Sequence, residues 1–162
     1  MIGGNDLHWL AGVIDKGCSI IAIPGKWLPR GQARGYTVRM CVSSTNFQLV
    51  ERVHVLTGMG YISTTPRENI NRIHHHHGIT KANANNRYTL LLHSGEAARL
   101  LEMVLPYLRT QVRKAEAALA LQKTLKGRRG RRTKSGSFYR RDVDKVDRLV
   151  TTLKERGTRT KI

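Results

Sequence analysis

The sequence predicts an α+β fold in which helices pack against a four-stranded antiparallel sheet. Segments with helical or strand periodicity follow one another in the order α-β-β-α-β-β-α, and further helical segments come after them. Pairs of strands between helices favour an antiparallel sheet over the parallel sheet of βαβ units. The length of 162 residues and the apolar content of 40% suit one domain with one core.

The first helix and the first two strands are predicted from capping residues, periodicity and turn residues. Asn5 or Asp6 is expected to cap the helix, which ends at Gly17. Residues 19–26 are rich in β-branched side chains and reach a Pro-Gly pair, and residues 35–43 alternate between two faces. We therefore expect two strands joined by a loop.

The next elements repeat this arrangement. A second helix follows its expected cap, Asn46, and ends at the sequence "TGMG". Strands are predicted over residues 61–67 and 87–93, with a long polar segment between them. Ser94 is expected to cap a third helix, which Pro106 interrupts.

The C-terminal part is predicted to be helical and basic. A helix over "YLRTQVRKAEAALALQKTL" precedes a basic loop rich in Gly and Ser, and a final helix with an apolar stripe follows. We divide the chain into a domain over residues 1–126, a basic Gly/Arg loop over residues 127–138, and a basic helix over residues 139–162 that packs on the same domain. The stripe of the final helix consists of Val143, Val146, Val150 and Leu153.

The charge of the chain is its strongest functional signal. The formal net charge is +18. The segment from Arg109 to Ile162 holds 18 of the 29 Lys and Arg residues but 5 of the 11 acidic residues. Self-repulsion of this size is typically neutralised by a polyanion. Nucleic acid is therefore the expected partner.

Other partners and compartments have less support. No stretch approaches the ~18 uninterrupted apolar residues of a membrane span, and no basic helix with an aromatic face indicates a membrane surface. No signal segment begins the chain, so we expect a cytoplasmic protein, or one of an organelle matrix if it is organelle-encoded. Cys18 and Cys41 lack disulfide or zinc spacing and are interpreted as ordinary strand residues.

The segment from Leu10 to Asp15, "LAGVID", resembles the motif that names the LAGLIDADG homing endonucleases. The resemblance continues in order along nearly the whole chain. "SIIAI" is similar to the strand after the motif, "LVERVHVLTGMGYI" to the second helix and its exit, and "LLEMVLPYLRTQVRKAEAALALQ" to the family's Pro-aromatic-Leu helix junction. One copy of the motif is present. The resemblance implies the single-motif type of this family, with an αββαββα fold and a saddle-shaped sheet.

The resemblance also implies partners and contact residues. With one motif per chain, the motif helix would pair with that of a second subunit in a homodimer. The predicted interface consists of Leu7, Leu10, Ala11, Gly12 and Ile14. The sheet would lie over nucleic acid, with base edges and phosphates in reach of basic side chains. The predicted contacts are Lys26, Arg34, Arg39, Arg67, Arg72, Arg87, Arg128, Arg129, Arg131, Arg132, Lys134, Arg140 and Arg141.

The family's catalytic positions fall on residues that lack the required chemistry. The resemblance implies DNA cleavage by Mg²⁺, held by an acid at the end of the motif helix. In an ungapped alignment that acid is replaced by Gly17, and Lys16 adds a positive charge beside it. Gln111 stands where the family has a lysine near the catalytic water. Asp15 is the residual candidate acid. We interpret the chain as a degenerate nuclease without cofactor or metal, Mg²⁺ being required only if cleavage persists.

Two polar segments are interpreted as contacts to nucleic acid. His74 to His77 lack a Cys or carboxylate at metal-site spacing, which favours a loop over the nucleic acid rather than a metal site. The run "GRRGRRTKSGSFYRR" joins two helices, and its glycines allow close approach to phosphates. Phe138 or Tyr139 can stack on an exposed base.

Three functions follow as hypotheses. The first is a LAGLIDADG-like pseudoenzyme that binds structured RNA, such as ribosomal or intron RNA, or duplex DNA, without cutting it. The excess charge and the Arg/Gly loop favour RNA slightly. The second is an active Mg²⁺-dependent homing endonuclease that cuts a long DNA site as a homodimer. The third is a module of a ribosome or another large ribonucleoprotein, present there as a monomer.

Overall fold

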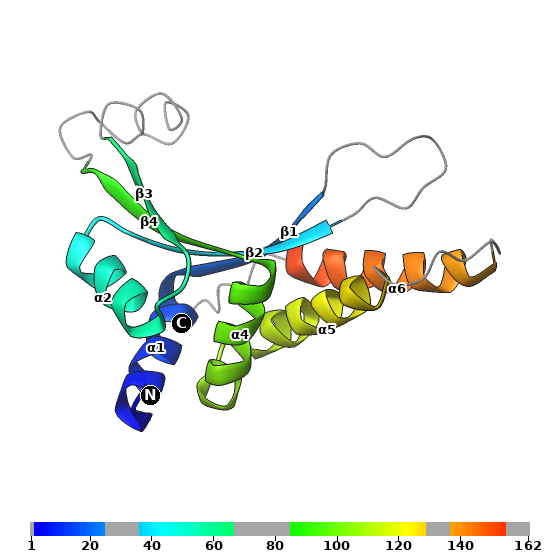
Figure 1. Ribbon diagram of the computed structural model, residues 1–162, viewed down its shortest axis with the longest axis horizontal. Coiled ribbons are helices and arrows are strands. Elements are labelled where there is room, and N and C mark those ends of the chain that lie inside the picture. Colours follow the sequence, from blue (N-terminus) through cyan, green and yellow to red (C-terminus); the bar gives the residue numbers. More distant parts are fainter. Residues whose placement is uncertain (1, 25–35, 67–84, 129–136, 155–162) are drawn as a thin grey trace, which may run out of the picture.

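In the computed structural model, a four-stranded sheet is covered on one side by helices (Figure 1). The structure describes residues 2–24, 36–66, 85–128 and 137–154. This arrangement confirms the predicted α+β fold. The elements run in the order α1 (Gly4–Gly17), β1 (Cys18–Pro24), β2 (Tyr36–Ser44), α2 (Phe47–Thr57), β3 (Tyr61–Thr65), β4 (Arg87–His93), α4 (Ser94–Val104), the 3₁₀ turn η2 (Leu105–Tyr107), α5 (Val112–Arg128) and α6 (Ser137–Lys154).

The sheet has the strand order β1-β2-β4-β3, and every neighbouring pair is antiparallel. Alternation along β2 buries Met40 and Val42 and directs Arg39 and Cys41 to the other face. In Figure 1 the ends of β3 and β4 on one side, and of β1 and β2 on the other, rise away from the helices. The sheet is thus a saddle with one face covered and one face open.

The core lies between the covered face and the helices, each of which contributes apolar side chains. The stripe of α6 is buried at Val146, Val150 and Leu153, and this helix packs against α5 and β1. That packing confirms the predicted stripe at these three positions, whereas the side chain of Val143 lies outside the described residues. In the described part of the chain, no helix combines the length and apolar character needed to cross a bilayer.

Several predicted boundaries were wrong. Gly3, rather than Asn5 or Asp6, holds the cap position of α1. Ser94 begins α4 instead of capping it, with φ of 44°, and His93 holds the cap position. The reason is that β4 passes into α4 without a loop, so the chain turns sharply at Ser94. α5 extends to Arg128 and α6 begins at Ser137, so both helices reach into the range 127–138 that was expected to be a loop.

Candidate nucleic-acid interface and the end of the motif helix

The carboxylate of Asp15, near the end of α1, is hydrogen-bonded to the segment that precedes α5. Its Oδ2 accepts the backbone N–H of Arg109 at 2.8 Å, and its Oδ1 accepts those of Thr110 at 3.0 Å and Gln111 at 2.9 Å. The hydroxyl of Thr110 donates to the same Oδ1 at 2.9 Å. These N–H groups belong to residues that precede α5, which begins at Val112, later than predicted.

The protonation of Asp15 follows from the same contacts. Burial raises the pKa of its carboxyl, but hydrogen bonds from the backbone of Arg109, Gln111 and Thr110 and from the Thr110 hydroxyl outweigh burial and hold the pKa below its ordinary value of 3.8. Asp15 is therefore a carboxylate at neutral pH, and both of its oxygens are engaged by the segment that precedes α5. Its role in the structure is to join the motif helix to α5.

Gly17 and Gln111, the two positions predicted to have lost catalytic residues, lie beside Asp15. The Nε2 of Gln111 donates to the carbonyl oxygen of Cys18 at 3.2 Å, which ties the start of α5 to the start of β1. Gly17 is exposed, and a Cβ added there would meet no atom within 4 Å. The structure thus places Asp15, Gly17 and Gln111 near one another at the end of α1.

These residues do not fit a Mg²⁺ site. Magnesium requires oxygen ligands with free lone pairs in octahedral geometry. Asp15 already accepts four hydrogen bonds, Gly17 has no side chain, and Gln111 can offer only a neutral amide oxygen, its Nε2 being bonded to a backbone carbonyl. Among the residues that the structure describes, no three His, Cys, Asp or Glu side chains gather where they would hold a metal ion.

The open face of the sheet carries the two predicted contact residues that lie on described strands. Arg39 of β2 stands between Ile21 of β1 and His93 of β4, its directly paired neighbours. Its Nε is buried and has no hydrogen-bond partner in the described part of the chain. Arg87 is exposed and stands opposite Thr65. Arg39 as a whole is partly exposed, so both residues place positive charge on the open face.

The other predicted contacts lie beyond what the structure describes. Arg128 ends α5, and Arg140 and Arg141 belong to α6, but their side chains are outside the described residues. The remaining predicted contacts and the four histidines fall in the undescribed ranges: Lys26, Arg34, Arg67, Arg72, Arg129, Arg131, Arg132, Lys134 and His74 to His77.

Sequence reasoning missed an aromatic pair on the open face. The ring of Tyr61 in β3 stacks with that of His93 in β4, with ring centroids 6.1 Å apart and planes at 16°. Leu91, directly opposite Tyr61, belongs to the same face. Strand alternation could have revealed this pair. Leu91 and His93 lie an even number of residues from Arg87 on the same strand, so they share the face that was predicted to contact the nucleic acid.

The predicted dimer interface requires correction. Leu10, Ala11 and Ile14 are buried in the chain's own core, so their side chains offer no surface to a second subunit. Leu7 also packs against that core, although it is only partly buried. They point inward because the sheet and the other helices cover this side of α1.

The opposite side of α1 is open to solvent. Gly12 is exposed there, and together with Trp9 and Val13 of the same helix it lines a hollow of about 540 Å³ that continues to Gly17 and β2. The guanidinium of Arg52 lies 4.4 Å from the ring centroid of Trp9. This outer side is the part of α1 that a second copy can reach.

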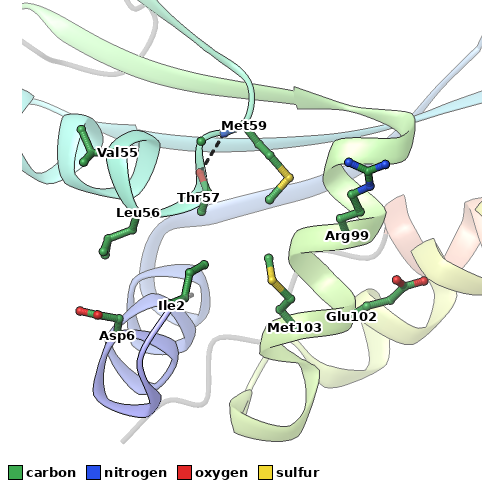
Figure 2. Close-up of a pocket in the computed structure, with 10 residues that line it drawn as sticks. Ile2, Asp6, Val55, Leu56, Thr57, Met59, Arg99, Glu102 and Met103 are labelled. Atoms are coloured by element: carbon green, nitrogen blue, oxygen red, sulfur yellow. Dashed lines mark hydrogen bonds between the residues drawn. The ribbon is translucent and has the colours of Figure 1, made fainter.

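A larger hollow, of about 810 Å³, lies between the start of α1, the end of α2 and α4 (Figure 2). Figure 2 shows Met59 and Met103 facing each other across it, between the end of α2 and α4. Arg99 and Glu102 of α4 and Asp6 of α1 contribute charged groups to its walls. This hollow is on the helical side of the sheet, so it is separate from the open face that carries Arg39.

The fold is that of the LAGLIDADG homing endonucleases, although the sequence matches no protein-family model and no curated protein. I-CvuI, solved with the I-CreI DNA target, has 17% identity and a TM-score of 0.61, with 94% of this chain and 84% of I-CvuI covered. The archaeal intron-encoded I-Vdi141I, solved with DNA, has 12% identity and a TM-score of 0.65, with 96% and 88% covered. I-SmaMI, solved with cleaved DNA, has 13% identity and a TM-score of 0.63; the match covers 88% of this chain and 42% of I-SmaMI.

Proposed function

We propose that this chain binds nucleic acid across the open face of its sheet and does not cleave it. The observation that carries the proposal is the hydrogen bonding of Asp15, whose carboxylate is engaged by three backbone N–H groups and one hydroxyl. The acid that the motif would supply is replaced by Gly17. Binding requires only complementary charge and shape, both of which the chain retains, whereas hydrolysis requires a metal-holding acid.

The partner is structured RNA or duplex DNA, with RNA favoured slightly by the excess of positive charge. Duplex DNA draws support from the similarity in fold to I-CvuI, I-Vdi141I and I-SmaMI, each solved with DNA. The net charge of +18 supports either polyanion. We would purify the protein from its native host at moderate salt and test the bound material with ribonuclease and deoxyribonuclease before sequencing it. A single RNA species supports the RNA proposal, a long duplex site supports the DNA proposal, and recovery of neither overturns both.

Restoring an acid at Gly17 tests the loss of the metal site. We expect Gly17→Asp to fold normally, because the position has open space for a side chain. The added charge should weaken nucleic-acid binding about fivefold in a chelator, and Mg²⁺ should restore it. Binding by the wild-type protein should not depend on Mg²⁺. Fluorescence anisotropy with and without Mg²⁺ measures both effects.

Gly4→Asp is the matched control, because Gly4 begins the same helix and also has open space around it. Its binding should change little and should not respond to Mg²⁺. The proposal is contradicted if wild-type protein already requires Mg²⁺ for binding.

An active endonuclease is the competing function, and I-SmaMI, whose structure contains cleaved DNA, favours it by similarity of fold. It requires that wild-type protein nick some member of a library of long duplex sites in Mg²⁺. It also requires that Asp15→Asn abolish nicking while binding is retained. We expect no nicking by the wild-type protein under these conditions.

We also propose that the chain forms a homodimer through the outer side of α1, where Trp9, Gly12 and Val13 line the hollow. Gly12→Glu would place two like charges near the twofold axis, which should weaken dimerisation at least about tenfold. Analytical ultracentrifugation measures the change, with Gly4→Glu as the control of equal charge. A wild-type chain that stays monomeric at high concentration, with or without nucleic acid, contradicts the dimer and favours the ribonucleoprotein module.

A further inference from the structure

The middle of the open face is unusual for a surface that contacts only phosphates and base edges. Strand register places Ile21, Arg39 and His93 in one row across β1, β2 and β4, and Tyr61 of β3 stacks with His93 at the end of that row. The side chain of Tyr61 is 54% exposed and that of Ile21 is 37% exposed. An aromatic and aliphatic strip therefore crosses the saddle.

This strip does not serve the core. The core lies under the opposite face of the sheet, where Ile62 and Leu90, the neighbours of Tyr61 and Leu91 in sequence, are packed. Two aromatic rings held nearly parallel on an open face expose apolar area without burying it in the fold. Exposed aromatic rings on strands are characteristic of surfaces that stack bases.

We propose that Tyr61 and His93 form a stacking site for an unpaired base of the bound nucleic acid. The inference rests on the proposed nucleic-acid binding and specifies the kind of nucleotide that occupies this site. In a continuous duplex the faces of the bases are covered by their neighbours, and a protein reaches only their edges. An unpaired base exposes a π-face, to which an aromatic ring is complementary.

The charges around the strip agree with this ligand. Arg39 is the direct strand neighbour of His93 and is partly exposed, so its positive charge lies beside the strip. A phosphate next to the stacked base would be attracted to that charge. Loops in RNA and single-stranded DNA both supply an unpaired base flanked by phosphates, so the site recognises a chemistry that the two share.

The test compares paired and unpaired probes. We would use an RNA hairpin with a fluorescent adenine analogue in its loop, the same hairpin in DNA, and a blunt duplex with the analogue paired. Binding of wild-type protein should change the fluorescence of the analogue in the hairpins and leave it unchanged in the duplex. Tyr61→Ala should weaken hairpin binding about tenfold and duplex binding less than about twofold. The RNA and DNA hairpins show which sugar the site accepts.

Conservative and matched variants separate stacking from other roles. Tyr61→Phe keeps the ring and should bind hairpins as the wild type does, whereas Tyr61→Leu keeps bulk without a ring and should behave as Tyr61→Ala. Phe47→Ala removes another part-exposed aromatic side chain, which lies against Tyr88 on the helical side. This control should leave both affinities unchanged.

Two results overturn the stacking site while leaving the proposed function intact: equal weakening of hairpin and duplex binding by Tyr61→Ala, or full hairpin affinity in Tyr61→Leu. Failure of the wild-type protein to bind any of the three probes at moderate salt would overturn the stacking site and the proposed function together.

Discussion

Replacing Asp15 by alanine is expected to lower the free energy of unfolding by about 2 kcal/mol. The carboxylate accepts the N–H groups of Arg109, Thr110 and Gln111, and alanine would leave these donors without their partner. It would also release the start of α5 from the end of α1. Urea unfolding followed by circular dichroism measures the loss.

The same experiment has a defined dependence on pH. The pKa of Asp15 in the folded protein lies below its ordinary value of 3.8, since hydrogen bonds to the carboxylate outweigh burial. Its contribution is therefore fully present above about pH 4 and is lost as pH falls through the lower, folded pKa. As the pH falls from about 4 through the folded pKa of Asp15, the difference in the free energy of unfolding between wild type and Asp15→Ala should become smaller.

Asp6→Ala is the control for this prediction. Asp6 lies on the same helix and forms an ion pair with Arg52 at 3.7 Å, in which the Arg52 side chain is 57% exposed. Removing such a pair should change stability by less than about 0.5 kcal/mol. If instead Asp15→Ala is as stable as wild type in the absence of metal, the hydrogen bonds of Asp15 do not stabilise the fold.

Gly60→Ala is expected to destabilise the protein by at least about 3 kcal/mol. Gly60 has φ of 79°, and a Cβ there would lie 2.5 Å from the carbonyl oxygen of Leu91 and 3.1 Å from Cγ of Leu92. Both neighbours belong to β4, so relief of the clash must separate β3 from β4. The substitution should therefore also disturb the stacking of the Tyr61 ring on that of His93.

Gly58→Ala separates the effect of the clash from that of backbone conformation. Gly58 also has a positive φ, of 61°, but a Cβ there would meet nothing within 4 Å. Gly58→Ala should therefore lower the free energy of unfolding by about 1 kcal/mol, the usual penalty of the left-handed conformation for alanine. Equal losses in the two variants, measured by thermal or urea unfolding, would show that close packing at Gly60 contributes nothing.

The order of helices and strands could be predicted from the sequence because it depends on local periodicity. Apolar residues recur at helical spacing along α1 and α6, and the alternation along β2 separates Met40 from Arg39 as predicted. The ends of elements were less predictable. Gln111, the residue before α5, donates its backbone N–H to Asp15, which is distant in sequence, and no local pattern contains that hydrogen bond.

The candidate site, too, could be predicted only in part from the sequence. Residue identity alone shows that Gly17 cannot supply a carboxylate and that Gln111 carries no charge. Which groups meet at the end of α1, and which side of that helix remains open, depends on contacts between segments remote in the chain. Leu10 and Ile14 were predicted to face a second subunit, yet the sheet and the other helices bury them.

The sequence by itself therefore determined the fold class, the net charge of +18 and the absence of a carboxylate at Gly17, because these follow from residue type and spacing. Only the tertiary structure decided that Asp15 binds the backbone before α5 and that Tyr61 stacks with His93. The physical reason is that a carboxylate serves equally as metal ligand or hydrogen-bond acceptor for a backbone turn, and an aromatic ring as core or surface. The choice between these roles depends on the neighbours that the fold supplies.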